Sequence, residues 1–440
     1  MLEKLANIFR VPELRKRIGF TLAMIFIYRV GGHIPTPGIN TKVLAEFFSQ
    51  YQNTLFGLYD MFVGGAFKKA TIFALGIMPY ITASIIMQLL GTLFPYLHKL
   101  QREGAEGRKK ITQYTRYGTV VLALVQSTAT SIWLQSITSP ETGASAVVPM
   151  LRGVSFTFVT AISLTTGTIF IMWLGEQITN RGIGNGISLI IFVGIVARLP
   201  DAVAGEIQQV AAGTRHPFSA LVVLAMVLAM TAFIIMMYQA SRRIPIQTPK
   251  KVVGTKMYAG QNTVLPLRLL MAGVIPMIFA SSLMFFPSLL GNFFPESEVV
   301  ESITGLFVPG HPVYSICFAL LIIFFTYFYT AIIFNPVDIA DNLKRSGGFI
   351  PGIRPGKKTA EFLDRVLTRI TLPAAVFLAF IAIVPFLFVG MFDISFFFGG
   401  TSVLIVVGVA LDTLQQLESH LQTRNYEGFL KKGRLKGRRF

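Results

Sequence analysis

Cysteine is almost absent from this sequence of 440 residues, since Cys317 is the only one. A single cysteine cannot form a disulfide within the chain, nor can it supply the ligands of an iron–sulfur cluster or of a cysteine zinc site. Because Cys317 lies inside an apolar run, we interpret it as a small buried hydrophobic residue. The five histidines are scattered and show no metal-ligand spacing. The sequence therefore predicts no metal site and no cofactor.

Charged residues are also scarce. They make up 14% of the chain, whereas hydrophobic residues make up 53%, and the mean hydropathy is +0.62. This composition is typical of a protein embedded in lipid. Of the few charged residues, 39 are Lys or Arg and 21 are Asp or Glu, which gives a net charge of +18. The positions of the basic residues are therefore informative.

Ten apolar runs are long enough to cross a bilayer as helices, which satisfy their own backbone groups in hydrocarbon. They lie near residues 18–34, 71–95, 116–136, 153–175, 184–199, 218–239, 270–294, 312–334, 370–390 and 396–417. The first run follows a basic stretch but has no small-residue cleavage pattern, so we interpret it as a retained helix and not as a signal peptide. An even number of spans places both termini on the same side.

The basic residues are distributed unevenly between alternate loops. Of the 39 Lys and Arg residues, 32 lie in the N-terminal segment and in every second loop after it, six lie in the other loops, and Arg29 lies within the first span. Because an excess of Lys and Arg marks the cytoplasmic side, we predict that both termini are cytoplasmic. Two of the basic loops, 240–269 and 335–369, are longer than a connection requires.

The basic side chains of these two loops are open to more than one interpretation. They are a topology signal, or they attract anionic lipid. The turn-forming and aromatic residues among them, as in GGFIPGIRPG at 347–356, indicate shaped loops that display basic side chains. This pattern favours a docking surface for a protein or a ribosome.

Two predicted spans share a sequence pattern. Residues 76–84, GIMPYITAS, align with residues 273–281, GVIPMIFAS, with Gly, Pro, Ile, Ala and Ser at identical offsets and a separation of 197 residues. Coincidence between two membrane helices rich in small residues is the alternative. Because the spans are the second and the seventh of ten, we predict two halves of opposite topology, an inverted repeat. Each proline removes a backbone donor, and we expect it to loosen its helix.

Residues 55–69, before the second span, are apolar and amphipathic but too short and too rich in glycine to cross the membrane. Such a segment lies at the interface or re-enters the protein interior. Re-entry would place it inside the helix bundle on the outer side.

Ionisable residues are rare within the predicted spans, which argues against an ion-coupled transporter. Arg29, Glu176 and Asp412 lie in or at the end of a span, and structural pairing or snorkelling accounts for them as well as a relay does. The segment GIRPGK at 352–357 is not a phosphate loop, because one residue is missing between its glycines and Lys358 stands where Ser or Thr is required. The sequence therefore predicts that any ATP-driven work comes from a partner.

The remaining interpretation is a pore without a charged filter. Isoleucines at helical spacing are the candidates for its lining, namely Ile81, Ile85, Ile187, Ile191, Ile275 and Ile278. Isoleucine in a membrane helix usually faces lipid or core, but the glycines of 182–186 let the fifth span begin close to neighbouring backbone. An apolar constriction blocks ions and water while closed and still admits an extended polypeptide.

Several stretches of the sequence resemble the SecY family of protein-conducting channels, in the same order and nearly from end to end. They are IPTPG at 34–38, ALGIMPYI at 74–81, QYTR at 113–116, GIGNG at 182–186, AGVIP at 272–276 and GIRPG at 352–356. The resemblance implies an all-α integral membrane protein of ten transmembrane helices, in two inverted five-helix halves with a re-entrant plug segment. The halves would be residues 1–200 and 201–420, followed by a basic cytoplasmic tail at 421–440.

The resemblance also implies roles for individual residues. The plug, at about 55–69, would include Phe56, Gly57, Leu58, Tyr59, Asp60, Met61, Phe62, Val63, Gly64 and Gly65. The pore ring would be Ile81, Ile85, Ile187, Ile191, Ile278 and Ile405, the last of which helical spacing does not select. The lateral gate between the second and seventh spans would include Pro79, Ser84, Pro276 and Ser281. The contacts with a motor or ribosome would be Arg242, Arg243, Lys250, Lys251, Arg354, Lys357, Lys358 and Tyr426.

The implied function is that of a passive channel in the bacterial inner membrane, not an enzyme. It would translocate unfolded secretory polypeptides and release transmembrane helices sideways into the phospholipid membrane, with signal sequences opening the lateral gate. The implied partners are SecE and SecG, the ATP-hydrolysing motor SecA, ribosomes, nascent polypeptides, the SecDF complex and YidC. The competing interpretations are an inverted-repeat secondary transporter of a small solute and a structural scaffold for insertion machinery.

Overall fold

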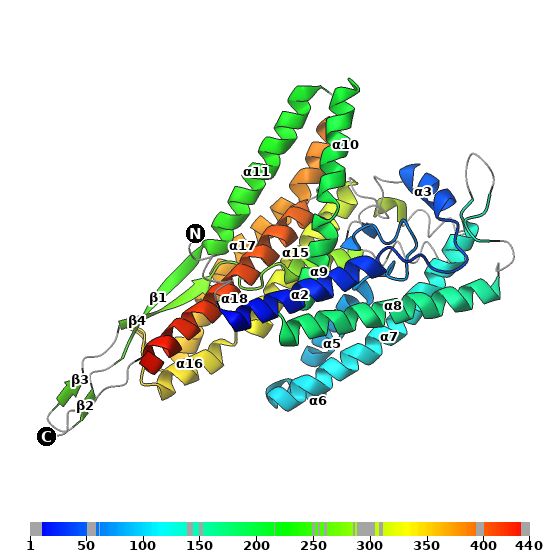
Figure 1. Cartoon of the computed structure of the whole chain (residues 1–440). Coiled ribbons are helices and arrows are strands. Elements are labelled where there is room, and N and C mark those ends of the chain that lie inside the picture. Colours follow the sequence, from blue (N-terminus) through cyan, green and yellow to red (C-terminus); the bar gives the residue numbers. More distant parts are fainter. Residues whose placement is uncertain are drawn as a thin grey trace. The chain divides into compact units, whose positions relative to one another are not determined.

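Figure 1 shows a computed structural model of the chain, and most of the chain that it describes is helical. The described residues are 11–50, 59–60, 62–138, 144–148, 153–214, 216–248, 251–253, 256–258, 262–284, 287, 304–307, 311–392 and 400–432. The helices are α2 (Pro12–Gly31), α3 (Thr41–Gln50), α5 (Met78–Leu93), α6 (Pro95–Arg102), α7 (Ala105–Ser136), α8 (Val154–Arg181), α9 (Gly186–Val196), α10 (Leu199–Ala211), α11 (Pro217–Gln239), α12 (Ile275–Met284), α15 (Pro312–Ile333), α16 (Pro336–Arg345), α17 (Lys357–Phe392) and α18 (Gly400–Lys432).

The predicted class of helical membrane protein is confirmed. Among the described residues, seven helices are long and apolar enough to cross a membrane, or eight if the bent pair of α5 and α6 is one span. The two other predicted spans correspond to α2, which carries Glu13, Arg15 and further basic residues in its first turns, and to α12, which has ten residues.

Two histidines that the sequence leaves without a role begin membrane-length helices. The Nδ1 atom of His216 accepts a hydrogen bond from the amide of Phe218 at 3.2 Å. His311 caps α15 in the same way, through the amide of Val313 at 3.2 Å. Each histidine is followed by a proline in the first turn, where a missing amide hydrogen removes no helical bond.

The predicted span at 71–95 is wrong as one continuous helix. Residues 72–77 form turns, and the helix begins at Met78. At Phe94 the chain bends by 107° between α5 and α6, because Phe94 is extended and Pro95 starts a new helix. The apolar composition of 71–95 therefore covers a turn segment as well as a span.

The chain divides into two compact units. The first contains Met1–Ile207, Phe285–Gly305 and Val409–Phe440, and the second contains Gln208–Met284 and Leu306–Gly408. In the first unit α7 packs on both α5 and α8, and α8 packs on α2 and α9. In the second unit α15 packs on α12 and α17.

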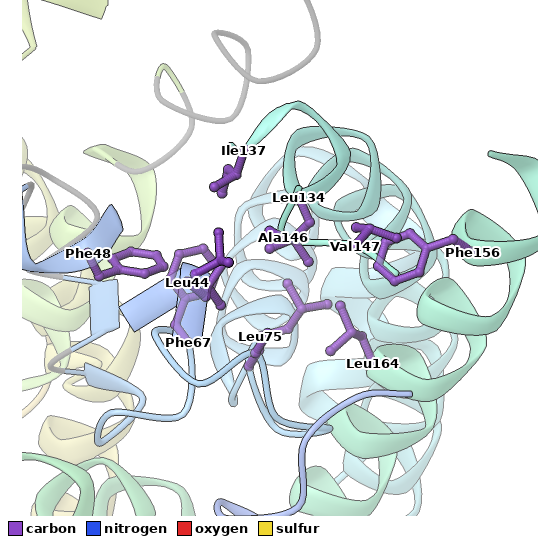
Figure 2. Close-up of a cluster of buried hydrophobic side chains, with 13 residues drawn as sticks. Leu44, Phe48, Phe67, Leu75, Leu134, Ile137, Ala146, Val147, Phe156 and Leu164 are labelled. Carbon is purple, nitrogen blue, oxygen red and sulfur yellow. The ribbon is translucent and has the colours of Figure 1, made fainter. Parts of the chain in front are cut away.

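A hydrophobic cluster in the first unit joins segments that are far apart in sequence (Figure 2). Its buried residues come from α3, from the turns before α5, from the end of α7, from residues 146–147 and from the first half of α8. They are Val43, Leu44, Phe48, Phe67, Ala70, Ala74, Leu75, Leu134, Ile137, Ala146, Val147, Phe156 and Leu164. The cluster fixes the turn segment before α5 to three helices.

The loop at 240–269 contains strands, so the all-α prediction needs a correction there. Strand β1 (Ser241–Gln247) pairs antiparallel with β4 (Asn262–Arg268), and β2 (Lys251–Val253) pairs with β3 (Lys256–Tyr258). In β1 the buried side chains of Ile244 and Ile246 alternate with exposed ones, as expected for a strand with one covered face.

The hairpin and the loop at 335–369 share one hydrophobic core. Ile244 and Leu267 of the hairpin pack with Ile350 and Leu363. The backbones of Gln247 and Phe349 exchange two hydrogen bonds of 2.9 Å. The two long basic loops are therefore one folded module, which we call the loop module (residues 241–268 and 335–370).

Leu267→Ala is expected to destabilise the loop module, because Leu267 is only 1% exposed and its truncation leaves a cavity. The loss is expected to be about 2–5 kcal/mol in the free energy of local opening. Hydrogen exchange of the amides in β1 measures it. The matched control is Val264→Ala, because Val264 lies on the same strand and is 52% exposed; equal effects of the two variants would contradict the shared core.

Candidate functional site

The helices α5 and α12 are each preceded by the same type of backbone turn. Gly76 and Gly273 both have a left-handed conformation, with φ of 56° and 59°, which glycine adopts without a steric penalty. The amide of Gly76 donates to the carbonyl three residues earlier at 2.9 Å, and that of Gly273 does the same at 3.4 Å. The repeat at an offset of 197 residues therefore extends from the sequence to the backbone.

The prediction that the two prolines loosen their helices is wrong. Pro79 lies in the first turn of α5, and Pro276 is the second residue of α12. Amides of the first turn have no partner within the helix, so proline removes no hydrogen bond there. These prolines start the two helices and do not kink them.

The predicted plug is only partly described. Phe56, Gly57, Leu58 and Met61 lie outside the described residues. We use the name plug segment for residues 59–77 without Met61; it ends in turns before α5. Its backbone pairs with the IPTPG stretch, because the amide of Thr36 donates to the carbonyl of Ala70 at 2.9 Å and the amide of Ile72 donates to that of Ile34 at 3.0 Å.

The plug segment reaches the middle of a membrane-length helix. Gly167 lies halfway along α8, and a Cβ atom there would overlap the carbonyl oxygen of Ile72. Non-helical backbone at that depth is tolerated only where it is enclosed by protein or lines a cavity. The contact is made by Ile72, which lies just beyond the predicted re-entrant segment at 55–69, so re-entry of that segment stays a prediction.

Aromatic contacts hold the base of the plug segment. The ring of Phe67 stacks on Trp133 of α7 with a centroid distance of 5.7 Å. The rings of Phe48 and Tyr59 make edge contacts with the ring of Phe67, at centroid distances of 5.5 Å and 4.9 Å. Phe67 is also part of the cluster in Figure 2. Each such ring pair contributes about 0.5–1.5 kcal/mol beyond the area that it buries.

The tip of the plug segment lies against α9 and α2. The Cβ position of Gly64 is 2.9 Å from the Cα atom of Gly194, so the two backbones touch with no side chain between them. On the α2 side, the hydroxyl of Tyr28 donates to the carbonyl of Val63 at 3.3 Å, and Nη1 of Arg29 donates to that of Gly64 at 3.4 Å. Arg29 therefore has a structural role, since it connects α2 to the plug segment.

An ion pair joins the plug segment to the end of α9. Oδ2 of Asp60 lies 2.8 Å from Nη2 of Arg198, and the side chains are 3% and 25% exposed. Oδ1 of Asp60 accepts the amide of Lys68 at 2.9 Å. Burial first, and then the Arg198 guanidinium, lower the pKa of the Lys68 ammonium, an effect that Asp60 opposes. Sequence reasoning missed this role of Arg198, because no local pattern marks a partner 138 positions away.

The predicted pore residues are divided between the two units. Ile81 and Ile85 lie on α5 and Ile187 and Ile191 on α9, all in the first unit. The other two, Ile278 on α12 and Ile405 on α18, lie in the second unit. Five of the six are buried, with exposed fractions from 0% to 7%, and Ile187 is partly buried.

The start of α9 is close to its neighbours, as the glycines at 182–186 predict. A Cβ atom at Gly186 would overlap the carbonyl oxygen of Gly175 on α8. The side chain of Asn185 caps the helix by accepting the amide of Ile187 at 3.1 Å, and the amide of Gly184 donates to Oε1 of Gln416 at 2.9 Å. This turn fixes where the two isoleucines of α9 lie within the first unit.

The two serines predicted for the lateral gate, Ser84 and Ser281, make hydrogen bonds within their own helices. Oγ of Ser84 accepts a hydrogen bond from Gln88 at 3.2 Å. Oγ of Ser281, which is buried, donates to the carbonyl of Met277 at 2.8 Å.

Glu176 is part of a salt bridge between α7 and α8. Nε and Nη2 of Arg116 donate to its two carboxylate oxygens at 2.8 Å and 2.7 Å. This bidentate geometry supports the structural interpretation of Glu176 over a proton or ion relay.

Arg242, Arg243, Arg354, Lys357 and Lys358 of the loop module are exposed. Arg242 and Arg243 lie on β1, Arg354 lies in the turns between α16 and α17, and Lys357 and Lys358 begin α17. Lys250 lies outside the described residues, Lys251 begins β2 and Tyr426 lies in α18.

The comparisons with known proteins agree with one another. A family model described as SecY matches residues 71–414. The protein translocase subunit SecY of Haemophilus influenzae is 47% identical over 428 residues, covering 97% of this chain and 96% of that protein. The protein of the same name from Escherichia coli K12 is 46% identical over 428 residues, with the same coverage.

Solved structures share the fold. A protein-conducting channel has a TM-score of 0.65 with 19% identity, covering 96% of this chain and 95% of that one. A SecY structure described by its plug domain, which stabilises the closed state, has a TM-score of 0.62 with 19% identity and the same coverage. Sec61 in a canine ribosome–channel complex has a TM-score of 0.60 with 18% identity, again with this coverage.

Gly194→Ala is expected to loosen the plug segment, because the added methyl group would lie 2.9 Å from the carbonyl oxygen of Phe62. Overpacking of this kind costs about 1–3 kcal/mol, so the amides of Gly65 and Thr71 should exchange about tenfold faster. Hydrogen exchange with mass spectrometry measures the change. Gly205→Ala is the control, since no atom lies within 4 Å of its Cβ position; unchanged exchange in Gly194→Ala would rule out the close contact.

Proposed function

Because the chain belongs to the SecY family of protein translocase subunits, we propose that it is the pore-forming subunit of a protein-conducting channel. It is a multi-pass membrane protein and a channel subunit, not a catalytic enzyme. The observation that carries the proposal is the seated plug segment: irregular backbone enclosed by membrane-length helices is suited to a seal that can be displaced.

The substrates are unfolded secretory polypeptides and the transmembrane helices of nascent membrane proteins. In the proposed mechanism, an apolar signal sequence enters between α5 and α12 and widens the lateral gate, which includes Pro79, Ser84, Pro276 and Ser281. The identical starts of these helices support this role, because each begins at a glycine turn that can change its angle without breaking helical bonds.

We assign the constriction to Ile81, Ile85, Ile187, Ile191, Ile278 and Ile405. A ring of branched apolar side chains excludes ions and water when closed. Ile81 and Ile278 are equivalent positions of the repeat, which supports a ring built from both halves of the chain. Residues 1–200 and 201–420 are the proposed halves, and 421–440 the basic tail.

The proposed location is the bacterial inner membrane with both termini in the cytoplasm, on the basis of the charge distribution. The proposed partners within the membrane are SecE and SecG, with the SecDF complex and YidC as accessory proteins. The exposed basic residues of the loop module support docking of the motor SecA, which supplies ATP hydrolysis, and of the ribosome. Arg354 and Tyr426 are the proposed contacts with the motor.

Reconstitution tests the function directly. Vesicles that contain the full chain, the small subunits and the motor should take up a signal-bearing polypeptide when ATP is added, and protection from external protease measures the uptake. The same polypeptide without its signal sequence is the control. Transport of small solutes in place of polypeptides would overturn the proposal and favour a secondary transporter.

Replacement of Ile85 and Ile405 by Asn is expected to weaken the closed ring, because both side chains are at most 2% exposed and polar groups there attract water. Ion leak through resting vesicles should rise, and polypeptides with weakly hydrophobic signal sequences should be exported. Ile86→Asn is the matched control, since Ile86 lies on the same helix and is 41% exposed. Wild-type leak and selectivity in the double variant would contradict the ring assignment.

A further inference from the structure

Asp60 is the only Asp, Glu, Lys or Arg with a buried side chain in the part of the chain that the structure describes. A buried carboxylate is tolerated only where its charge is paired and its oxygens accept hydrogen bonds. Both conditions are met, because Oδ2 pairs with Arg198 at 2.8 Å and Oδ1 accepts the amide of Lys68 at 2.9 Å. The carbonyl of Asp60 also accepts the amide of Gly65 at 2.8 Å.

The two charges belong to parts of the channel that must separate when it opens. Asp60 lies in the plug segment, and Arg198 lies in the turn that follows α9. Helix α9 carries two residues of the proposed ring, Ile187 and Ile191, and touches the plug segment at Gly194. Displacement of the plug segment from α9 therefore requires the carboxylate to leave the guanidinium.

We propose that the Asp60–Arg198 ion pair is a latch that holds the plug segment closed and sets how hydrophobic a signal sequence must be to open the channel. This inference rests on the proposed function. The base of the plug segment is fixed by apolar packing around Phe67, and the ion pair of Asp60 ties the segment to the turn after α9. A signal sequence opens the channel only when its insertion supplies the energy that separates the pair.

The surroundings of the two charges predict an order of effects. Arg198→Gln leaves the buried carboxylate of Asp60 without its cation, which is the more costly change. Asp60→Asn leaves the charge of Arg198, whose side chain is 25% exposed and can be hydrated, while the new side chain still accepts the amide of Lys68. The double variant removes both charges, and loss of a whole buried pair is commonly close to neutral.

Lys68 is a second cation near the pair. After burial, the positive charge of Arg198 is the next cause that lowers the pKa of its ammonium. Its ammonium can move toward Asp60 when Arg198 is replaced. Lys68→Gln is therefore combined with Arg198→Gln to remove the substitute cation. Lys69→Gln is the matched control, because Lys69 is the next residue in the chain and its side chain is exposed.

The experiment measures three properties of the full chain reconstituted with the small subunits: ion leak of resting vesicles, hydrogen exchange of the amides of Gly65 and Lys68, and, after addition of the motor and ATP, export of a polypeptide with a shortened signal sequence. Arg198→Gln should raise leak and exchange by at least about tenfold and should allow the export. Asp60→Asn should have a smaller effect, and the double variant should be closer to wild type than Arg198→Gln alone.

Two results would overturn the latch. The first is that Arg198→Gln, with or without Lys68→Gln, matches Lys69→Gln in leak and exchange. The second is that the effects of Asp60→Asn and Arg198→Gln simply add, because independent sites behave in that way. If the wild-type chain exports no polypeptide, the proposed function fails, whereas the exchange measurement still shows whether the pair holds the plug segment.

Discussion

Backbone amides and carbonyls inside a membrane must find partners within the protein, because lipid offers none. Most of this chain meets that demand with helices, but the plug segment cannot. It takes partners from other parts of the chain, namely the backbone at Ile34 and Thr36, the hydroxyl of Tyr28 and the guanidinium of Arg29, and its own Asp60 carboxylate accepts the amide of Lys68. The same demand explains why glycines lie where helices approach the plug segment. The backbone of Gly194 comes so close to the segment that a side chain at this position would crowd it.

These borrowed contacts suit a segment that must be both closed and movable. A continuous helix would satisfy its own backbone, so its position would depend on side-chain packing alone. The plug segment instead has many separate contacts of modest strength, among them the ring contacts of Phe67 and the long hydrogen bond from Arg29. These contacts together hold the plug segment against α2, α7 and α9.

The sequence predicts the elements whose signal is local. Apolar length identifies most spans, and the match between residues 76–84 and 273–281 identifies the repeat. It does not show that Pro79 starts its helix, because that depends on the left-handed conformation of Gly76. The β1–β4 hairpin is hidden by its charges and prolines, and its alternation is evident only once Ile244 and Ile246 are seen to be covered by the second loop. The contact between Asp60 and Arg198 has no local signal at all.

The hairpin also has a mechanical consequence. Strand β1 follows directly from α11, and β4 leads within a few residues to the glycine turn that starts α12. Its core also includes Leu363 of α17. A force on β1 and β4 therefore acts on the ends of α11 and α12 and, through the shared core, on α17. The loop module therefore couples a force on this surface to the first residues of α12.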